Sequence, residues 1–442
     1  MNIALGIDIG TTKAAAVIYD TEKNLLLASV SRDTKADIPC ADSRHEQDAS
    51  KIFITIDEII GALDPALKSK ITSIGVTGQM HGVILSAGEK VSPLVTWKDA
   101  RATASGRLAE INAKQGCEKL RDGFGFTSLA CLAAEGKLAE WTSASTIHDL
   151  LFTRICALET PTCDWTNAAS WGLFDVFKNR WDFDAIRSLN IPVRLLPRLA
   201  APGTGAGKLS QKFASKWGLK PGIPIAAALG DNQASILASS FSTEEEIYLT
   251  VGTGAQLSVV VSKGLAQELP SSPAMELRPF INGQLLAVSA PLCGGQAFAW
   301  LVKSLAGFMK DIGVEAPAEA QLYARLDELG MRSFDSPLTL KPSFLGERHA
   351  PALRGEIENI GLNDFALGNL TSALAYGIIM NMRSMMPGWV FKGRKRVIAS
   401  GNAMRKLSIM RAKAEQIFSL PIVLSGSKEE AACGAAILST KL

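Results

Sequence analysis

The sequence predicts a two-domain α/β protein, and three observations lead to this prediction. A chain of 442 residues is too long for one ordinary hydrophobic core. A strand, a Gly-Thr turn and a second strand occur at 3–19 and again at 247–261, which indicates a weak duplication at domain scale. The buried run at 224–228 leads into Gly-Asp and a helical segment, as at the ligand-binding edge of an open α/β sheet. We therefore expect domains at 1–240 and 241–442, joined between about residues 238 and 246.

The composition indicates a globular protein that acts on a small molecule. Hydrophobic residues make up 47% of the chain and charged residues 20%, which is typical of soluble domains. The formal net charge is only +3, and no basic run interleaves with aromatic residues, so we expect no nucleic-acid partner. The seven cysteines are scattered and form no Cys-x-x-Cys pair, as expected for reduced thiols. The four histidines show no metal-ligand spacing, so a zinc site is not expected.

The start of the chain and its apolar runs indicate a cytoplasmic protein. Asp8 interrupts the first apolar stretch and no basic segment precedes it, which argues against a signal peptide. Apolar runs of ~18 residues without a charge, the length a membrane helix needs, do not occur. We expect no membrane association, and either a monomer or a homodimer.

The first hairpin is a candidate phosphate site. Strands are predicted at 3–9, 13–19 and 25–30, and the turn at 10–12 consists of Gly-Thr-Thr. The backbone N–H groups of such a turn can surround a phosphate. Asp8, at the end of the first strand, points to the same place. The alternative interpretation is an ordinary hairpin turn.

Two short motifs in the first half suit a sugar. A helix at 48–62 and a strand at 71–76 precede Gly-Gln-Met-His-Gly at 78–82, where two glycines bracket three side chains that can reach a polar ligand. Trp-Lys-Asp-Ala-Arg follows at 97–101 and offers a flat apolar face, an acceptor and a forked donor. The alternatives are a β-turn with an incidental histidine, and a core tryptophan beside a surface Asp–Arg pair.

The middle of the chain gives weaker signals. Residues 104–142 look helical with a break at 123–126, and 161–200 look irregular, with Asn-Ala-Ala-Ser at 167–170 as a turn between short strands. The glycine-rich run at 202–207 is predicted to be a connector, because no Gly-Lys-Ser/Thr follows it.

The second half repeats the α/β pattern. A third strand is expected at 285–290, and the glycine pair at 294–295 begins a helix whose N-terminal N–H groups can bind an anion. A long helix at 369–386 precedes a strand at 396–400. The segment 401–404 leads into a helix at 405–417, and a strand at 421–424 and a helix at 430–438 end the chain.

Asp231 lies where the buried strand at 224–228 gives way to a helix. A carboxylate in that place is either a helix N-cap or a general base. For an isolated Gly-Asp the cap would be preferred. The polar motifs elsewhere in the chain favour the base.

Five motifs stand in one order, at 6–12, 78–82, 97–101, 230–233 and 346–351. Together they resemble the FGGY family of carbohydrate kinases over essentially the whole chain. Within that family the motifs at 78–82 and 97–101 are most similar to the sedoheptulokinase group, with the xylulokinase group next. The resemblance implies two ribonuclease-H-like domains of the actin/hexokinase/Hsp70 type that flank a cleft.

The resemblance also implies the roles of individual residues, with ATP and Mg²⁺ as cofactors. Asp231 would be the catalytic base, and Asp8 would be catalytic through the magnesium–phosphate site. The phosphates would face Thr11, Thr12 and Lys13. The sugar would be held by Gln79, Met80, His81, Trp97, Asp99, Arg101 and Asn232. The nucleotide would be held by Gly252, Thr253, Gln296, Gly401 and Asn402.

The implied reaction is ATP-dependent phosphorylation of the terminal primary hydroxyl of a ketose. Sedoheptulose is the first candidate, xylulose the second, and other ketoses or polyols follow. One departure from the family is the adenosine loop, which usually begins with two or three glycines but reads Ser-Gly-Asn-Ala-Met at 400–404. The rival classes are a chaperone-like ATPase and a sugar-binding regulator without catalysis. The sugar motifs argue against the first, and the presence of both Asp8 and Asp231 argues against the second.

Overall fold

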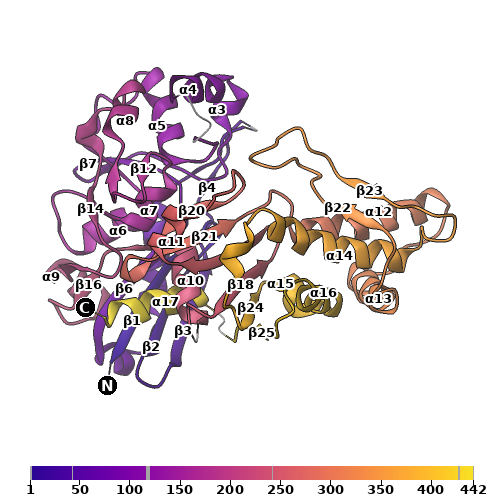
Figure 1. The fold of residues 1–442 in the computed structure, drawn as a ribbon. Helices are drawn as coiled ribbons and strands as arrows, with labels where there is room; N and C mark the ends of the chain where they lie inside the picture. Colours follow the sequence, from indigo (N-terminus) through magenta and orange to yellow (C-terminus); the bar gives the residue numbers. More distant parts are fainter. Residues whose placement is uncertain (1, 42, 116–119, 241, 427–428, 442) are drawn as a thin grey trace. The chain divides into compact units, whose positions relative to one another are not determined.

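The computed structural model describes residues 2–41, 43–115, 120–240, 242–426 and 429–441 (Figure 1). Strands and helices alternate in two compact units, which confirms the predicted α/β class. The first unit contains the described residues of 1–239, 278–283 and 427–442, and the second contains those of 240–277 and 284–426. The end of the chain thus packs with its beginning. The predicted domain division at residue 240 stays a prediction.

The first unit is built on a seven-stranded sheet in the order β15-β16-β6-β1-β2-β3, with β17 also paired to β6. β1 pairs antiparallel with β2 and parallel with β6, and β2 pairs antiparallel with β3, as the predicted three-stranded meander requires. Gly205–Lys208 forms an edge strand, so the connector predicted at 202–207 is partly wrong. The strands are β1 (Ile3–Ile9), β2 (Lys13–Asp20), β3 (Leu25–Asp33), β6 (Ile71–Gly78), β15 (Gly205–Lys208), β16 (Pro224–Ala226) and β17 (Leu229–Gly230).

Side chains alternate between the two faces of the sheet along β1, and this alternation determines on which face Asp8 lies. Its four isoleucine and leucine side chains enter the core beneath α1 (Ala49–Gly61), α6 (Ile147–Ile155) and α9 (Gln211–Trp217). Ala4 lies in a separate cluster with residues of α17 (Glu430–Ser439). Because side chains alternate between the faces of a strand, Gly6 and Asp8 share the α17 face with Ala4.

Glycines let α17 approach the sheet and its neighbour α10 (Asp231–Ser239) closely. A Cβ on Gly75 would lie 1.9 Å from the carbonyl oxygen of Ala435, and one on Gly434 would lie 1.7 Å from that of Ala234. Gly6 faces a similar obstruction from the α17 backbone. Backbone therefore packs directly on backbone here, and α10 is held firmly against α17.

Two expectations for the middle of the chain need correction. The break predicted at 123–126 exists, but α5 (Gly125–Ala134) already begins inside it, after α4 (Arg107–Gln115). The turn predicted at 167–170 is wrong, because these residues lie in helix α7 (Trp165–Ser170). Asp164 caps α7 by accepting the backbone N–H groups of Thr166 and Asn167, which starts a helix where the sequence suggested only a turn.

The first unit has a second hydrophobic core, which is built around aromatic side chains. It contains Phe126, Trp171 and Trp181, whose rings contact one another at centroid distances of 5.5–6.0 Å. The remaining strands and α-helices are β4 (Asp37–Ile38), β5 (Glu46–Gln47), α2 (Pro65–Lys68), β7 (Ile84–Ala87), β8 (Lys90–Val91), β9 (Leu94–Val95), α3 (Arg101–Ala104), β10 (Ser143–Ser145), β11 (Thr162–Asp164), β12 (Phe174–Asp175), β13 (Arg180–Trp181), α8 (Phe183–Ser188) and β14 (Arg198–Ala200).

The second unit repeats the strand pattern of the first. Its sheet has the order β20-β21-β19-β18-β24-β25, in which β18 pairs antiparallel with β19 and parallel with β24. The predicted third strand is present as β21, antiparallel to β19. The strands are β18 (Glu246–Val251), β19 (Ala255–Val261), β20 (Glu276–Pro279), β21 (Leu285–Ser289), β24 (Arg396–Ser400) and β25 (Ile422–Leu424). The main helices are α12 (Gly295–Asp311), α13 (Glu319–Arg332), α14 (Leu367–Ser384) and α16 (Ser408–Phe418).

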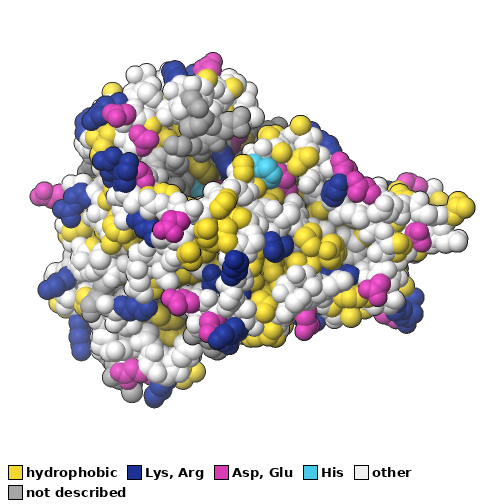
Figure 2. Space-filling model, in the orientation of Figure 1, with side chains coloured by type: hydrophobic (Ala, Val, Ile, Leu, Met, Phe, Trp, Pro, Cys, Tyr) yellow, Lys and Arg dark blue, Asp and Glu magenta, His cyan; other side chains and the backbone are white. Residues whose placement is uncertain are grey.

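The surface carries charge of both signs. On the face that Figure 2 draws, Lys and Arg side chains are interspersed with Asp and Glu. Such mixing gives a weak long-range field, in keeping with the small net charge of +3. No helix in the described part of the chain has both the length and the apolar character needed to cross a membrane.

Candidate active site

Asp8 and Asp231 come from strand ends that flank β6. Thr77 of β6 pairs with Asp8 of β1 on one side and with Leu229 of β17 on the other. Asp231 follows Leu229 by two residues and is the first residue of α10. The sheet register therefore brings the two predicted catalytic aspartates to the same edge of the sheet.

Burial changes the chemistry of both carboxyl groups. It raises the pKa of Asp231 to about 6, although the N–H of Asn232, 2.7 Å from Oδ1, and the charge of Arg278 oppose part of that rise. Burial also raises the pKa of Asp8 to about 7, and the negative charges of Asp231 and Glu429 add to the effect. A carboxylate with a pKa near 6 is suited to accept a proton at neutral pH.

Asp8 has the properties of a ligand for a hard divalent cation. Its Oδ1 is buried and has no hydrogen-bond partner among the described residues. The negative charges of Asp231 and Glu429 act on the same carboxyl group, so a cation there would relieve their repulsion. Mg²⁺ takes oxygen ligands and usually needs only one or two carboxylates beside water and phosphate oxygens. The residues present fit that ion.

Lys13, predicted to face the phosphates, is paired with Glu429 from the far end of the chain. Its Nζ lies 2.9 Å from both carboxylate oxygens of Glu429. Glu429 is the residue before α17, and nothing in the local sequence distinguishes it from other surface carboxylates. The two partners are 416 residues apart, so the local sequence gives no sign of the pair.

Thr11 connects the first hairpin to the predicted sugar motifs. Its Oγ1 accepts the indole N–H of Trp97 at 2.9 Å and lies 3.3 Å from Oε1 of Gln79. The amide of Gln79 donates to Gln47 at 3.0 Å, and Gln47 donates in turn to the carbonyl of Thr11 at 2.7 Å. Three predicted residues thus meet at Thr11, and two of them bond to Gln47, which the sequence gave no reason to single out. Thr12 lies beside them in the same turn and is exposed.

Met80 and His81 of the 78–82 motif make different kinds of contact. Met80 is buried, and a Cβ on Gly230 would lie 2.8 Å from its Sδ, so Met80 packs directly on the residue before Asp231. His81 has a φ of 72°, which is uncommon for a residue with a side chain. Its ring stacks on Phe124, with centroids 4.9 Å apart. Nδ1 lies 2.7 Å from the carbonyl oxygen of Ser170, so Nδ1 carries the proton and donates.

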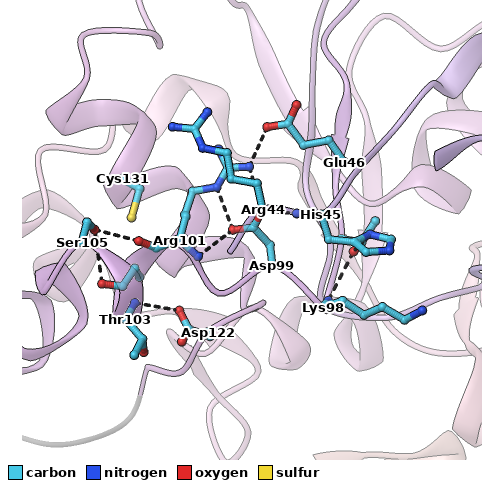
Figure 3. A network of polar contacts seen from close by, with 12 residues as sticks. Arg44, His45, Glu46, Lys98, Asp99, Arg101, Thr103, Ser105, Asp122 and Cys131 are labelled. Atoms are coloured by element: carbon cyan, nitrogen blue, oxygen red, sulfur yellow. Dashed lines mark hydrogen bonds and ion pairs between the residues drawn. The ribbon is translucent and has the colours of Figure 1, made fainter. Parts of the chain in front are cut away.

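Asp99 and Arg101 satisfy one another inside the protein (Figure 3). Nε of Arg101 donates to Oδ1 of Asp99 at 2.7 Å, and a terminal nitrogen donates to Oδ2 at 2.8 Å and to Glu46 at 2.6 Å. Burial opposes the charge of Arg101, but these bonds outweigh it and raise the pKa of the guanidinium above its ordinary value. Asp99 also accepts the backbone N–H of His45 at 2.9 Å. The pair is predicted to bind sugar, and its contacts fix the segments that carry Glu46 and Trp97.

The predicted nucleotide residues lie together in the second unit. The N–H of Gln296 donates to the carbonyl of Thr253 at 3.0 Å, and a Cβ on Gly295 would lie 2.0 Å from the carbonyl oxygen of Gly252. Gly401 has a φ of 89°, a conformation that glycine adopts without strain, and packs on the end of β18. The exposed Asn402 begins helix α15 (Asn402–Lys406), and α16 starts at Ser408, so the single helix predicted at 405–417 is divided at Leu407.

Two domain models of one protein family together match almost the full length of the chain. The N-terminal domain model of the FGGY family of carbohydrate kinases matches residues 3–238, and the C-terminal domain model matches 247–441. The chain is 32% identical to a sedoheptulokinase of Homo sapiens over 99% of its own length and 97% of that protein. It is 31% identical to a sedoheptulokinase of Mus musculus with the same coverage.

Solved structures show the same fold. A xylulose kinase from Rhodospirillum rubrum has a TM-score of 0.86 and 20% identity, covering 99% of this chain and 89% of that one. A structure titled as a xyloylose kinase from Brucella ovis has a TM-score of 0.84 and 21% identity, with coverage of 99% and 90%. The chain belongs to the FGGY family of carbohydrate kinases. It is a sugar kinase, an enzyme of a family whose substrates are ATP and a sugar.

Proposed function

We propose that this kinase transfers the γ-phosphoryl group of ATP to the terminal primary hydroxyl of a ketose, and that the ketose is sedoheptulose. The observation that carries the proposal is the half-buried Asp231 at the start of α10, with a pKa raised to about 6, on the same sheet edge as Asp8. The choice of sugar is supported by the sedoheptulokinases to which nearly the whole chain is similar. Xylulose remains the alternative ketose, and the substrate comparison below separates the two.

In the proposed reaction, the carboxylate of Asp231 accepts the proton of the sugar hydroxyl. The oxygen then forms a bond to the γ-phosphorus as the bond from that phosphorus to the bridging oxygen breaks, and ADP leaves with the released electron pair. Phosphoryl transfer depends mainly on alignment and charge neutralisation. Mg²⁺ bound near Asp8 would supply part of that neutralisation. Backbone N–H groups of the Gly-Thr-Thr turn would hold phosphate oxygens.

Replacing Asp8 by Asn should weaken the response to magnesium. The variant keeps the shape of the side chain but removes its charge. If Asp8 acts largely through water, we expect the magnesium concentration for half-maximal activity to rise by ~10-fold or more. This is the scale for residues that bond to a metal's ligands rather than to the metal itself. We also expect kcat to fall. Titration of activity with MgCl₂ measures both, and Asp33→Asn at the exposed end of β3 is the control. An unchanged titration would mean that Asp8 does not support a magnesium site.

The activity should decline in acid because the base must be ionised. We expect kcat/KM, measured at saturating magnesium, to lose a factor of about ten per pH unit below a midpoint of about 6, the raised pKa of Asp231. An ordinary aspartate would keep full activity down to about pH 4. A profile that stays flat to pH 5 would show that Asp231 does not have to lose a proton for the reaction.

Sedoheptulose should be a better substrate than xylulose. A seven-carbon ketose carries more hydroxyl groups, and each one that meets a buried polar partner adds discrimination against an analogue lacking it. We expect a higher kcat/KM for sedoheptulose than for xylulose and no significant turnover of glycerol. His81→Ala should reduce this preference more than it reduces sugar-independent ATP hydrolysis. A higher kcat/KM for xylulose would reverse the choice of ketose and leave the kinase reaction itself intact.

A further inference from the structure

The chain segment that ends at Asp231 is held by polar side chains at three consecutive positions. Each of the three residues before Asp231 has one backbone N–H or C=O group that bonds to a buried side chain on another element. The bonds are Asn167 Nδ2 to Ala228 O at 2.8 Å, Thr77 Oγ1 to Leu229 O at 2.7 Å, and Gly230 N to Thr166 Oγ1 at 2.9 Å.

These bonds complete a segment whose strand pairing is too short to satisfy all of its backbone groups. β17 has only two residues, and it pairs with β6 at those two positions. A buried backbone N–H or C=O without a partner costs about as much as a lost hydrogen bond, so side chains have to complete this segment. Two of the three partners, Thr166 and Asn167, come from the six-residue helix α7.

The hydroxyl of Thr166 is itself fixed in direction. It donates to Oδ1 of Asp164 at 2.5 Å, and Thr166, Asp164 and Gly230 are all buried. Since the hydroxyl hydrogen is used in that bond, the oxygen presents its lone pairs to the N–H of Gly230. Asn167 is anchored as well, because its Nδ2 lies 3.2 Å from Oδ1 of Asp149.

The other end of α7 holds the predicted sugar residue His81. The backbone N–H of His81 donates to Oγ of Ser170 at 3.0 Å, and that hydroxyl donates to the carbonyl of Asn167 at 2.7 Å. Nδ1 of the His81 ring bonds to the carbonyl of Ser170. One short helix therefore contacts both the segment that ends at the base and the histidine of the sugar motif.

We propose that α7 is a positioning element for phosphoryl transfer, and that Thr166 is the residue through which it orients Asp231. Thr166 bonds to the backbone of Gly230 and sets the direction in which the chain enters α10. The proposal rests on the assignment of Asp231 as the base. Reacting groups have to be aligned closely, and a displacement of ~1 Å by a remote mutation can cost ~10²-fold in rate.

The test compares Thr166→Val with Thr166→Ser in the full-length enzyme, with sedoheptulose and magnesium-ATP. Valine keeps the shape and removes the acceptor, so we expect kcat to fall by ~10- to 10²-fold while both KM values stay within ~2-fold. Serine retains the hydroxyl and should restore kcat to nearly the wild-type value. The control is Thr127→Val on α5, where a buried hydroxyl without a hydrogen-bond partner among the described residues is removed. Its kinetics should match the wild type.

A second measurement is independent of activity. Hydrogen exchange at the Gly230 amide should be at least ~10-fold faster in Thr166→Val than in the wild type, because its acceptor is gone. Wild-type kcat and wild-type exchange in Thr166→Val would overturn the proposal. So would equal losses in Thr166→Val and Thr127→Val, since these would reflect core packing alone. If Thr166→Val folds poorly, Thr166→Cys provides a weaker acceptor of similar size and should give an intermediate kcat.

The double variant separates this proposal from the base assignment. If Thr166 acts through Asp231, adding Thr166→Val to Asp231→Asn should lower kcat no further than Asp231→Asn alone. Full additivity of the two losses would contradict the positioning role. Near-wild-type turnover in Asp231→Asn would instead contradict the base assignment.

Discussion

Asp231→Asn should lower kcat by ~10²- to 10⁴-fold, the range for a positioned general base, while the KM values for sugar and ATP change little. The amide cannot accept the hydroxyl proton, but its oxygen can still accept the N–H of Asn232 that now lies 2.7 Å from Oδ1. The variant therefore keeps this contact at the start of α10 and removes only the proton acceptor. Steady-state kinetics on the folded protein measure the loss.

This variant distinguishes the two interpretations of Asp231 that the sequence left open. Asparagine is about as good an N-cap as aspartate, so a residue that served only as a cap would tolerate the change. The matched control is Asp48→Asn, which caps α1 by accepting the N–H of Ser50 at 2.8 Å. It should retain wild-type kcat. Near-wild-type turnover of Asp231→Asn would identify Asp231 as a cap and leave the reaction without its proposed base.

Gly434→Ala should destabilise the first unit and lower kcat together. Its new Cβ would lie 1.7 Å from the carbonyl oxygen of Ala234, so α17 and α10 would have to separate. Overpacking of this kind costs ~1–3 kcal/mol or more in the free energy of unfolding. The loss of activity follows because α10 begins at Asp231. Denaturant titration and steady-state kinetics measure the two effects.

Gly307→Ala on α12 is the matched control for this variant. It is also a glycine within a helix, but no atom lies within 4 Å of the Cβ it would gain. Alanine is favoured over glycine in a helix by about 1 kcal/mol, so this change should be neutral or stabilising. Equal stability of Gly434→Ala and the wild type would mean that the close approach of the two helices is not required.

The sequence predicted the sheets well because their signals are local. Apolar runs of five to eight residues bounded by glycine or polar turns located β1, β2, β3 and β6, and the repeated Gly-Thr hairpin located β18 and β19. The position of Asp8 at the end of β1 followed from the same pattern. Short elements were less predictable. The turn expected at 167–170 proved to be part of α7, because Asp164 caps the segment and buried partners hold it as a helix.

Parts of the candidate site depend on contacts that no local pattern reveals. Glu429 pairs with Lys13 although 416 residues separate them in the sequence, and Gln47 bonds to residues of two separate motifs. Asp99 and Arg101 were predicted from their chemistry, but their mutual pairing depends on burial and on Glu46. Residue types thus led to the predicted site residues, whereas the partners of those residues could be found only in the folded chain.

The most direct test of the account is ketose-dependent release of ADP by the purified protein. With magnesium-ATP, we expect sedoheptulose to stimulate ADP release strongly, and phosphorus NMR to detect one phosphate ester on the terminal carbon of the sugar. Asp231→Asn should lose this stimulation. The account would be contradicted if no ketose stimulated ADP release, or if Asp231→Asn released ADP as fast as the wild type.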